Sequence, residues 1–483
     1  MNPFDRVPVG HLIAGEWLSA GPIDESFNPS NDRALGSFHS ADRAVADAAI
    51  AAAADAFASA ATARWRTDPE LRARVLWSMA DALHRDQEVL ATALALENGK
   101  TIASATAEVA RSAGKLRHAA GLALTDMGRS AVSPQGELSV LLKEPIGVAG
   151  IITPWNSPVI LAVRSLAAAL AAGCVVVMKM PAQTALTGAL LARTLSSVPD
   201  LPAGVLNVVT ESGSDLARSL VVDPRVAAVS YTGSTAVGTS IMAAAAPTLT
   251  HLVLELGGKT PVLLLSDADV DAAVPVLVDA ATRFAGQFCM AGTRLIVHEG
   301  VVDELTAKLT IALSAVRMGP GIDPSSQMGP LIDHAAVSRV GELVAAAERD
   351  DGVEVVVRGG PTEGVGSFYG AALVRIPAAG SALTQTEIFG PVMTIEVVDS
   401  DESAVERAND TPFGLAASVW TFDDARAQRV SSAINAGTIW VNTWGRVLER
   451  FEEGGHKLSG LGRLGGVSGI AEFQLTKHVM RRA

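Results

Sequence analysis

The distribution of apolar residues along the chain predicts alternating strands and helices. Between Gly147 and about Val253, apolar runs at 148–152, 174–178 and 205–209 alternate with helical stretches. Continuous apolar strands between helices are typical of a parallel sheet that is covered on both faces. Such sheets bind ligands at the carboxyl ends of their strands. This part of the chain therefore predicts an α/β architecture of the nucleotide-binding type.

The segments before this alternation have different patterns. Residues 1–40 are interrupted by Pro and Gly, which predicts loops and short strands. Ala is the best helix former, so the Ala-rich region that follows predicts helices over 42–65, 70–97 and 102–127. Residues 128–145 predict an apolar ribbon, which needs cover that a subunit contact could provide.

A second α/β segment is predicted from Glu255 to about Ala436. It contains expected helices over 270–285 and 303–316, on either side of a strand at 295–298. A Gly- and Pro-rich loop follows around 317–330, and the chain is expected to end in a short polar segment. With 483 residues the chain is too long for one hydrophobic core, so two or three domains are expected.

Charge and cysteine usage narrow the possible partners and compartments. Lys plus Arg total 38 and Asp plus Glu total 51, so the net charge of −13 argues against nucleic-acid or anionic-membrane partners. The apolar stretch Leu166–Met178 is too short to span a bilayer and predicts a helix followed by a buried strand. Two distant cysteines and no apolar run of signal-peptide type at the N-terminus favour a cytoplasmic protein.

The stretch from Phe284 to Arg294 holds the candidate nucleophile, Cys289. Gly286 and Gly292 flank the thiol and would let a backbone approach a ligand closely. A thiol on such a loop can act as a nucleophile if a neighbouring group activates it. A buried structural cysteine is the alternative for Cys289, and Cys174, inside an apolar strand, is interpreted as a packing residue.

Two further motifs carry polar groups that suit a reacting thiol. Asn156 ends Pro-Trp-Asn after a strand, where its amide could donate to a developing oxyanion. Glu255 in Glu-Leu-Gly-Gly-Lys is a plausible general base at a strand end. A simple turn and a solvated loop carboxylate are the respective alternatives.

Other motifs suit a dinucleotide. Lys179 closes a strand and could bind a ribose or phosphate, or only reach solvent. The segment 231–238, Tyr-Thr-Gly-Ser-Thr-Ala-Val-Gly, would present backbone N–H groups to a pyrophosphate, although it is not the G-x-G-x-x-G fingerprint. Glu387-Ile-Phe-Gly-Pro391 adds a carboxylate and an aromatic ring. The scattered histidines form no metal-binding motif, so no metal is expected.

In this order, Pro-Trp-Asn, strand–Lys, Gly-Ser-Thr-x-x-Gly, Glu-Leu-Gly-Gly-Lys, Gly-Gln-x-Cys, Glu-x-Phe-Gly-Pro and Gly-x-x-x-Val-Asn resemble the aldehyde dehydrogenase superfamily. The resemblance runs from Leu12 to Arg463. It implies a Rossmann-type cofactor domain (1–118 and 141–254), an α/β catalytic domain (255–436) and a small bridging or oligomerisation region (119–140 and 437–483). It also implies a small-molecule aldehyde substrate, NAD or NADP as cofactor, and a homodimer or homotetramer.

The resemblance assigns roles to individual residues. Cys289 would attack the aldehyde to form a thiohemiacetal and then a thioester. Asn156 would hold the oxyanion, and Glu255 would activate water to release the acid. By the same resemblance, the cofactor-binding residues are Ile152, Trp155, Lys179, Ala182, Gly213, Gly233, Ser234, Leu256, Gly257, Glu387 and Phe389.

Departures from the family pattern bear on cofactor and substrate. Ala182 replaces an acidic residue that normally grips the adenosine ribose, so NADP should be accepted. Arg164 and Phe288 are the candidate substrate residues. Arg164 could stack on an aromatic or hydrophobic aldehyde, the favoured interpretation, or clamp a semialdehyde carboxylate such as that of succinate semialdehyde. It could also pair with an acidic residue at a domain contact. A CoA-acylating enzyme and a non-catalytic relative are further alternatives. The presence of Glu255 argues against the first, and Cys289, Glu255 and Asn156 together argue against the second.

Overall fold

The computed structural model describes residues 3–7, 10–125, 128–377 and 381–482, and its two large sheets confirm the expected α/β class. The first is an eight-stranded sheet in the order β2-β1-β9-β8-β7-β10-β11-β23. Its five central strands run parallel, and β1 and β23 are antiparallel to their neighbours. The strands are β1 (His11–Ile13), β2 (Glu16–Leu18), β7 (Val148–Ile152), β8 (Val175–Pro181), β9 (Leu206–Glu211), β10 (Val226–Thr232), β11 (His251–Glu255) and β23 (Gly460–Leu461).

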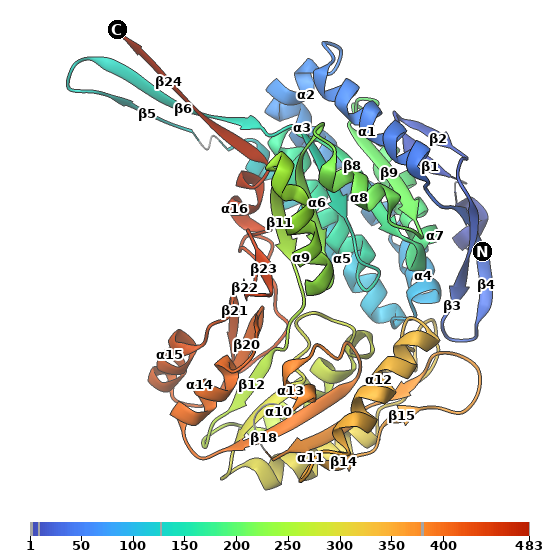
Figure 1. The fold of residues 1–483 in the computed structure, drawn as a ribbon, viewed down its shortest axis with the longest axis vertical. Helices are drawn as coiled ribbons and strands as arrows, with labels where there is room; N and C mark the ends of the chain where they lie inside the picture. The colour runs from blue at the N-terminus through green and yellow to red at the C-terminus, as the bar shows by residue number, and fades with distance from the viewer. Residues whose placement is uncertain (1–2, 8–9, 126–127, 378–380, 483) are drawn as a thin grey trace.

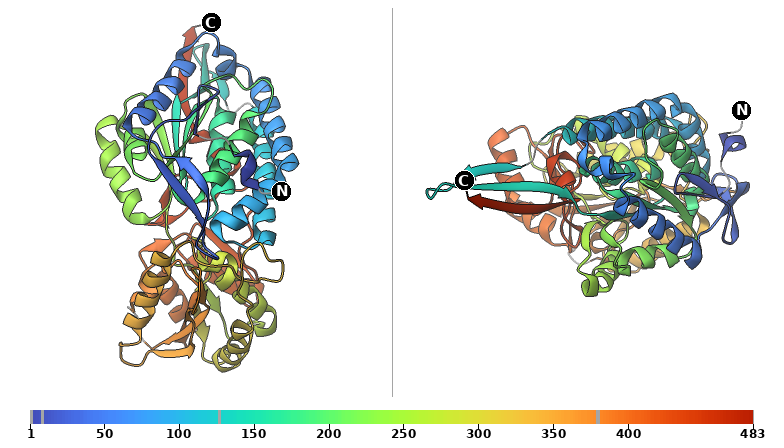
Figure 2. Two further views of the ribbon diagram at one scale, coloured as in Figure 1. Left: turned by 90° about the vertical axis from the view of Figure 1, so that its right-hand side faces the viewer. Right: turned by 90° about the horizontal axis from the view of Figure 1, so that it is seen from above.

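Helices cover both faces of this sheet, as its apolar strands require. In Figure 2 the lighter blue and cyan helices lie on one side of the sheet, and the light-green helices lie on the other together with the darker blue helix at residues 43–58. They enclose a core rich in Ala, Val and Leu. The helices are α1 (Arg43–Ala58), α2 (Ala63–Thr67), α3 (Pro69–Arg85), α4 (Gln87–Asn98), α5 (Ile102–Ala123), α6 (Pro158–Ala172), α7 (Ala185–Ser196), α8 (Asp215–Val222), α9 (Thr235–Ala245) and α16 (Gly466–Ala471).

The second large sheet has seven strands in the order β14-β17-β18-β13-β12-β20-β21. All neighbours are parallel except β14, which is antiparallel to β17. It occupies the lower half of Figure 1. Its strands are β12 (Pro261–Leu264), β13 (Arg294–His298), β14 (Glu354–Val357), β17 (Ala372–Ile376), β18 (Val392–Val398), β20 (Ala416–Trp420) and β21 (Thr438–Val441). Its helices are α10 (Val270–Thr282), α11 (Val302–Ser314), α12 (His334–Ala347), α13 (Ala382–Gln385), α14 (Asp401–Asn409) and α15 (Asp424–Ala433).

A three-stranded sheet projects from the body as an arm (Figures 1 and 2). It consists of β5 (Arg129–Val132), β6 (Glu137–Pro145) and the C-terminal β24 (Gln474–Arg482). The short polar segment that is expected at the end of the chain forms strand β24, which pairs with β6 along nine residues. Small two-stranded sheets are formed by β3 (Ile23–Asn28) with β4 (Arg33–His39), β15 (Gly360–Pro361) with β16 (Tyr369–Gly370), and β19 (Phe413–Gly414) with β22 (His456–Lys457).

Several predicted helices are interrupted. The helix expected over 70–97 is divided at Asp86, and the helix expected over 42–65 ends at Ala58. The helix expected over 102–127 ends at Ala123, and its predicted last residue, Met127, lies outside the described residues. Within the described ranges, no helix combines the length and apolar character that crossing a bilayer requires.

Candidate active site

The carboxyl ends of three neighbouring strands bring the predicted polar groups together. β7, β10 and β11 lie side by side, with Tyr231 opposite Ile152 and Thr232 opposite Glu255. The loop after β7 carries Asn156, and the turn after β10 leads into α9. Parallel strands end at one edge of a sheet, so these groups share that edge.

The loop with Cys289 reaches this edge from the second sheet. The helix expected over 270–285 instead ends at Thr282, and Phe284 and Ala285 follow with positive φ angles of 53° each. Gly286 also has a positive φ, and a Cβ there would lie 2.3 Å from the carbonyl oxygen of Gly390. Only a residue without a side chain fits this approach. The break in the helix therefore delivers the thiol to the edge of the first sheet.

Asn156, Glu255 and Cys289 line one cavity of about 350 Å³. The side-chain nitrogen of Asn156 donates a hydrogen bond to the main-chain carbonyl of Gln287 at 2.9 Å, which leaves its second N–H group available. One carboxylate oxygen of Glu255 is buried without a hydrogen-bond partner. The cavity thus combines a thiol, an amide donor and a carboxylate, the groups that acyl chemistry at a cysteine needs.

Burial dominates the protonation of the thiol and the carboxyl. It raises the pKa of Cys289 to about 12, the Glu387 carboxylate adds to the rise, and Arg164 opposes it. It also raises the pKa of Glu255 to about 7, again opposed by Arg164. At neutral pH the thiol is therefore protonated, and Glu255 is near half ionisation, where a carboxylate can exchange protons efficiently.

The cavity gathers many of the predicted cofactor-binding residues. Trp155, Gly233, Ser234, Leu256, Glu387 and Phe389 all line it. Trp155 and Phe389 meet edge to face at 5.5 Å. Glu387 accepts a hydrogen bond from the N–H group of Gly258 at 3.3 Å, and burial raises its pKa to about 7.

Other predicted residues do not line this cavity. Ile152 is buried at the end of β7, and Gly213 lies in the turn between β9 and α8. Lys179 lies in β8, and Ala182 lines a separate cavity of about 600 Å³ beside β3 and β4. Gly257 is close to Glu387, since a Cβ on it would lie 2.4 Å from a Glu387 carboxylate oxygen.

The two candidate substrate residues do not line the cavity either. Arg164 is buried, and its Nη1 atom lies 3.2 Å from Glu453 and 3.9 Å from Glu255. Its Nη2 atom donates to the Thr232 hydroxyl at 2.9 Å. The pairing with an acidic residue is therefore present, while a role in substrate binding stays a prediction. Phe288 packs edge to face on Phe284 and Trp444.

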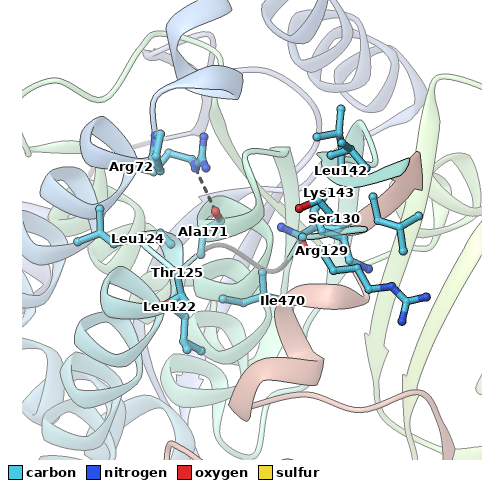
Figure 3. Close-up of a pocket in the computed structure, with 16 residues that line it drawn as sticks. Arg72, Leu122, Leu124, Thr125, Arg129, Ser130, Leu142, Lys143, Ala171 and Ile470 are labelled. Atoms are coloured by element: carbon cyan, nitrogen blue, oxygen red, sulfur yellow. Dashed lines mark hydrogen bonds between the residues drawn. The ribbon is translucent and has the colours of Figure 1, made fainter. Parts of the chain in front are cut away.

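A different cavity, of about 490 Å³, lies at the base of the arm (Figure 3). Its lining combines the apolar side chains of Leu122, Leu124 and Ile470 with Arg129 and Lys143. Arg72 donates to the carbonyl of Ala171 at 3.0 Å at its edge. None of the predicted site residues lines this cavity. It is therefore distinct from the cavity that contains Cys289.

Sequence reasoning did not identify two contributors to the site. Arg339 of α12 lines the cavity and donates to the carbonyl of Ile388 at 2.6 Å. Lys100 donates to the carbonyl of Asn156 at 2.7 Å and forms a buried ion pair with Glu108. Neither Arg339 nor Lys100 belongs to a motif with a recognisable spacing. The one possible clue was the position of Lys100 directly after Asn98-Gly99 at a helix end.

No metal site accompanies these groups in the part of the chain that the structure describes. In those residues, no three His, Cys, Asp or Glu side chains are grouped to hold a metal ion. Both cysteines are free, and Cys174 is fully buried with its thiol 3.3 Å from the carbonyl of Phe473.

Comparison with known proteins agrees with the geometry. Residues 17–479 match the model of the aldehyde dehydrogenase family. A succinate-semialdehyde dehydrogenase of Paenarthrobacter nicotinovorans is 38% identical over 89% of this chain and 95% of its own length. An NADP(+) succinate-semialdehyde dehydrogenase of Escherichia coli is 35% identical over 97% of this chain and 96% of its own. The crystal structure of a Staphylococcus aureus betaine aldehyde dehydrogenase with NAD+ has a TM-score of 0.96 at 31% identity, covering 100% of this chain and 96% of the other.

The chain belongs to the aldehyde dehydrogenase family. It is an oxidoreductase that oxidises aldehydes with NAD or NADP, and Cys289 is its catalytic cysteine. The predicted fold, enzyme class and cofactor type are confirmed.

Proposed function

We propose that this enzyme converts an aldehyde to the carboxylic acid through a thioester on Cys289 that water hydrolyses. The observation that carries the proposal is the shared cavity of Cys289, Asn156 and Glu255. The thiol transfers its proton to a water molecule, and its sulfur then attacks the aldehyde carbon, forming a thiohemiacetal. The free N–H group of Asn156 and the main-chain N–H group of Cys289 stabilise the resulting oxyanion.

The later steps release the acid. A bound NAD or NADP would supply the hydride acceptor, so that loss of hydride from the thiohemiacetal carbon leaves a thioester on the Cys289 sulfur. Glu255 then accepts a proton from a water molecule while that water attacks the thioester carbon. The C–S bond breaks, the sulfur leaves as the thiolate, and the carboxylic acid is free. The carboxylate of Glu255 favours water over coenzyme A as the acceptor of the acyl group.

The residues around the cavity fit a dinucleotide. The turn at Gly233 and Ser234 opens α9, whose first N–H groups and positive end of the helix dipole suit a pyrophosphate. Glu387 and Lys179 would hold the two ribose units, and Phe389 would pack near the nicotinamide. Ala182 offers no carboxylate to repel a 2′-phosphate, so we propose that NADP is accepted. The division into cofactor, catalytic and bridging regions stays a proposal, as does the cytoplasmic location.

For the substrate, we propose a short semialdehyde with a distal carboxylate. Two buried cations, Lys115 and Arg164, share the single carboxylate of Glu453, and the Nε atom of Arg164 has no hydrogen-bond partner. Such donors can bind a second carboxylate. Relatives named as succinate-semialdehyde dehydrogenases agree with this class.

An aromatic or hydrophobic aldehyde is the second candidate. Phe288 belongs to a group of rings with Phe284, Trp440 and Trp444, next to Cys289 in the sequence and packed around its loop. However, Arg164 already donates hydrogen bonds to Glu453 and Thr232, which leaves its guanidinium less freedom to rotate onto a substrate ring.

Kinetics with three aldehydes separate the candidates. We expect succinate semialdehyde to have a higher kcat/KM than benzaldehyde or propanal. Arg164→Leu should raise KM for succinate semialdehyde about 10-fold or more, because a hydrogen bond to a charged group contributes about 1.5–3 kcal/mol, and should change KM for propanal much less. A preference for benzaldehyde would favour the second candidate. Parallel changes in all KM values would make Arg164 purely structural.

We also propose that the arm joins subunits into a homodimer or homotetramer. Its apolar side chains Val132, Leu142, Leu475, Val479 and Met480 are exposed on the single chain. Light scattering would test this, because removing residues 474–483 should then yield a smaller species.

A further inference from the structure

Two carboxylates compete for one guanidinium beside the catalytic cavity. The Nη1 atom of Arg164 lies 3.2 Å from Glu453 and 3.9 Å from Glu255. Glu255 lines the cavity with Cys289, whereas Glu453 lies behind Arg164 and does not line it. The negative charge of Glu453 partly neutralises Arg164. A change in the Glu453–Arg164 interaction therefore changes how much Arg164 stabilises the ionised form of Glu255.

The position of Glu453 is fixed by the fold. Its main chain exchanges two hydrogen bonds with Leu464, at 2.6 and 2.9 Å. One of its carboxylate oxygens lies 2.8 Å from the Nζ atom of Lys115 on α5, and the other faces Arg164 on α6. Burial alone would raise the pKa of Glu453, yet Lys115 and Arg164 lower it below its ordinary value. Glu453 is thus a fixed negative charge at neutral pH.

Few charged groups face Glu255, and they come from separate elements. Arg164 on α6 and Arg463, just after β23, favour its ionised form, while Glu453 opposes ionisation. The Cys289 thiol lines the same cavity as Glu255. The hydroxyl of Thr232 accepts a hydrogen bond from Arg164 and makes none with Glu255. One oxygen of Glu255 has no hydrogen bond. Burial has the largest effect on the pKa of Glu255, and the nearby charges, rather than hydrogen bonds, have the next largest.

We propose that Glu453 is a positioning residue that, by holding Arg164, sets the pH range in which Glu255 acts as a base. Lys115 takes part as the counter-charge that limits how strongly Glu453 holds Arg164. This inference rests on the proposed role of Glu255 in hydrolysing the thioester, and it adds Glu453 as a residue that acts through Arg164 without itself touching the substrate.

The test measures hydrolysis of the acyl-enzyme as a function of pH. p-Nitrophenyl acetate would acetylate Cys289 with release of nitrophenol, and the linear phase that follows reports loss of the acetyl group to water. Glu453→Gln keeps the shape of the side chain but removes its charge. Arg164 then acts on Glu255 alone. The acidic limb of the pH–rate profile, where the rate of the linear phase falls as the pH is lowered, should therefore move about one pH unit lower. At a given pH on that limb the relative rate should rise roughly tenfold.

Lys115→Met should have the opposite effect. Glu453 then holds Arg164 more strongly and a positive charge is lost, so the acidic limb should move to higher pH. Glu452→Gln is the matched control, because its carboxylate instead accepts a hydrogen bond from the N–H group of Ser468 at 3.1 Å, and its limb should stay in place. If Glu453→Gln does not give folded protein, Lys115→Met decides.

The outcomes are distinguishable. The inference would be overturned if the acidic limb of the pH–rate profile stays in place in both variants, or moves in the same direction in Glu453→Gln and Lys115→Met. In either case the enzyme would still form and hydrolyse an acyl group. If the wild type instead shows no nitrophenol burst and no burst of reduced cofactor with aldehyde, the proposed covalent route itself fails.

Discussion

The side-chain nitrogen of Asn156 lies 2.9 Å from the main-chain carbonyl oxygen of Gln287, two residues before Cys289. This hydrogen bond ties the loop after β7 to the loop that carries the thiol. On the other side, Asn98 donates to the carbonyl of Trp155 at 2.6 Å. The proposed oxyanion donor is therefore held from both directions at a fixed place relative to the nucleophile.

Replacing Asn156 by Ala should remove one oxyanion donor and leave the thiol in place. We expect kcat/KM to fall about 10²–10³-fold, the usual effect of losing such a donor. Steady-state kinetics with the best aldehyde provide the measurement. Asn31→Ala, at an exposed turn, is the control and should be close to wild type. A loss of less than about fivefold in Asn156→Ala would show that other donors hold the oxyanion.

The two cysteines should respond very differently to substitution by Ser. Cys289→Ser should lower kcat by about 10³-fold or more, because a hydroxyl is a far weaker nucleophile than a thiol here. Cys174→Ser places a hydroxyl in a buried strand, where the carbonyl of Phe473 can accept its hydrogen bond, so activity should be retained. Initial rates of NADH or NADPH formation, with melting curves for folding, decide between them. Similar losses in two folded variants would contradict the assignment.

The fold could be predicted where burial leaves an apolar pattern. The run at 148–152 is buried on both faces and was recognisable as a strand. β24 was not, because eight of its nine residues are exposed and main-chain hydrogen bonds to β6 hold it without any apolar period. The helix break before Gly286 was also missed, since Phe284 and Ala285 adopt a left-handed conformation that their residue types do not favour.

The site shows the same division between local and distant information. Asn156, Glu255 and Cys289 are within motifs, so their order along the chain was sufficient to predict them. The partner of Arg164 was not predictable, because Glu453 is 289 residues away and only the return of the chain after β21 brings it close. Ala182 illustrates a further limit. The sequence shows that an alanine replaces the usual acidic residue, but it does not show the cavity beside β3 and β4 that Ala182 lines.

Replacing Glu255 by Gln should separate the two halves of the reaction. Hydride transfer precedes water activation, so the variant should still give a burst of about one reduced cofactor per site, while steady turnover falls about 10²–10⁴-fold. In the wild type, the pKa of about 7 predicts that hydrolysis slows as the pH falls below 7, because the protonated carboxyl is not a base. Stopped-flow absorbance gives both values. Loss of the burst would mean that Glu255 also accepts the thiol proton.

The cofactor preference should respond to a single carboxylate at position 182. Ala182→Glu would introduce a group that accepts hydrogen bonds from ribose hydroxyls and repels a 2′-phosphate. We expect the ratio of kcat/KM for NAD over NADP to rise at least about tenfold. Gln183→Glu, one residue further along the same turn, serves as a control for added charge. Strict NAD selectivity in the wild type would contradict the proposal.

Lys100 should prove important for both stability and the position of Asn156. It forms a buried ion pair with Glu108, donates to the carbonyl of Asn156 at 2.7 Å and lies 3.9 Å from the centre of the Phe284 ring. Lys100→Met would leave Glu108 buried without its counter-charge, at a cost of about 3–5 kcal/mol. We therefore expect Tm to fall by several degrees and, in the folded fraction, kcat/KM to fall as well, because Asn156 and the Cys289 loop lose a common contact.

The matched control for Lys100 is Lys477→Met, which breaks an exposed ion pair with Glu144 on the arm. Exposed pairs contribute less than about 1 kcal/mol, so its Tm should stay near that of the wild type. Adding Glu108→Gln to Lys100→Met removes the uncompensated charge and should restore part of the lost stability, but not the contact to Asn156. If the double variant recovered stability and full activity together, Lys100 would act only as a counter-charge and would not position the oxyanion donor.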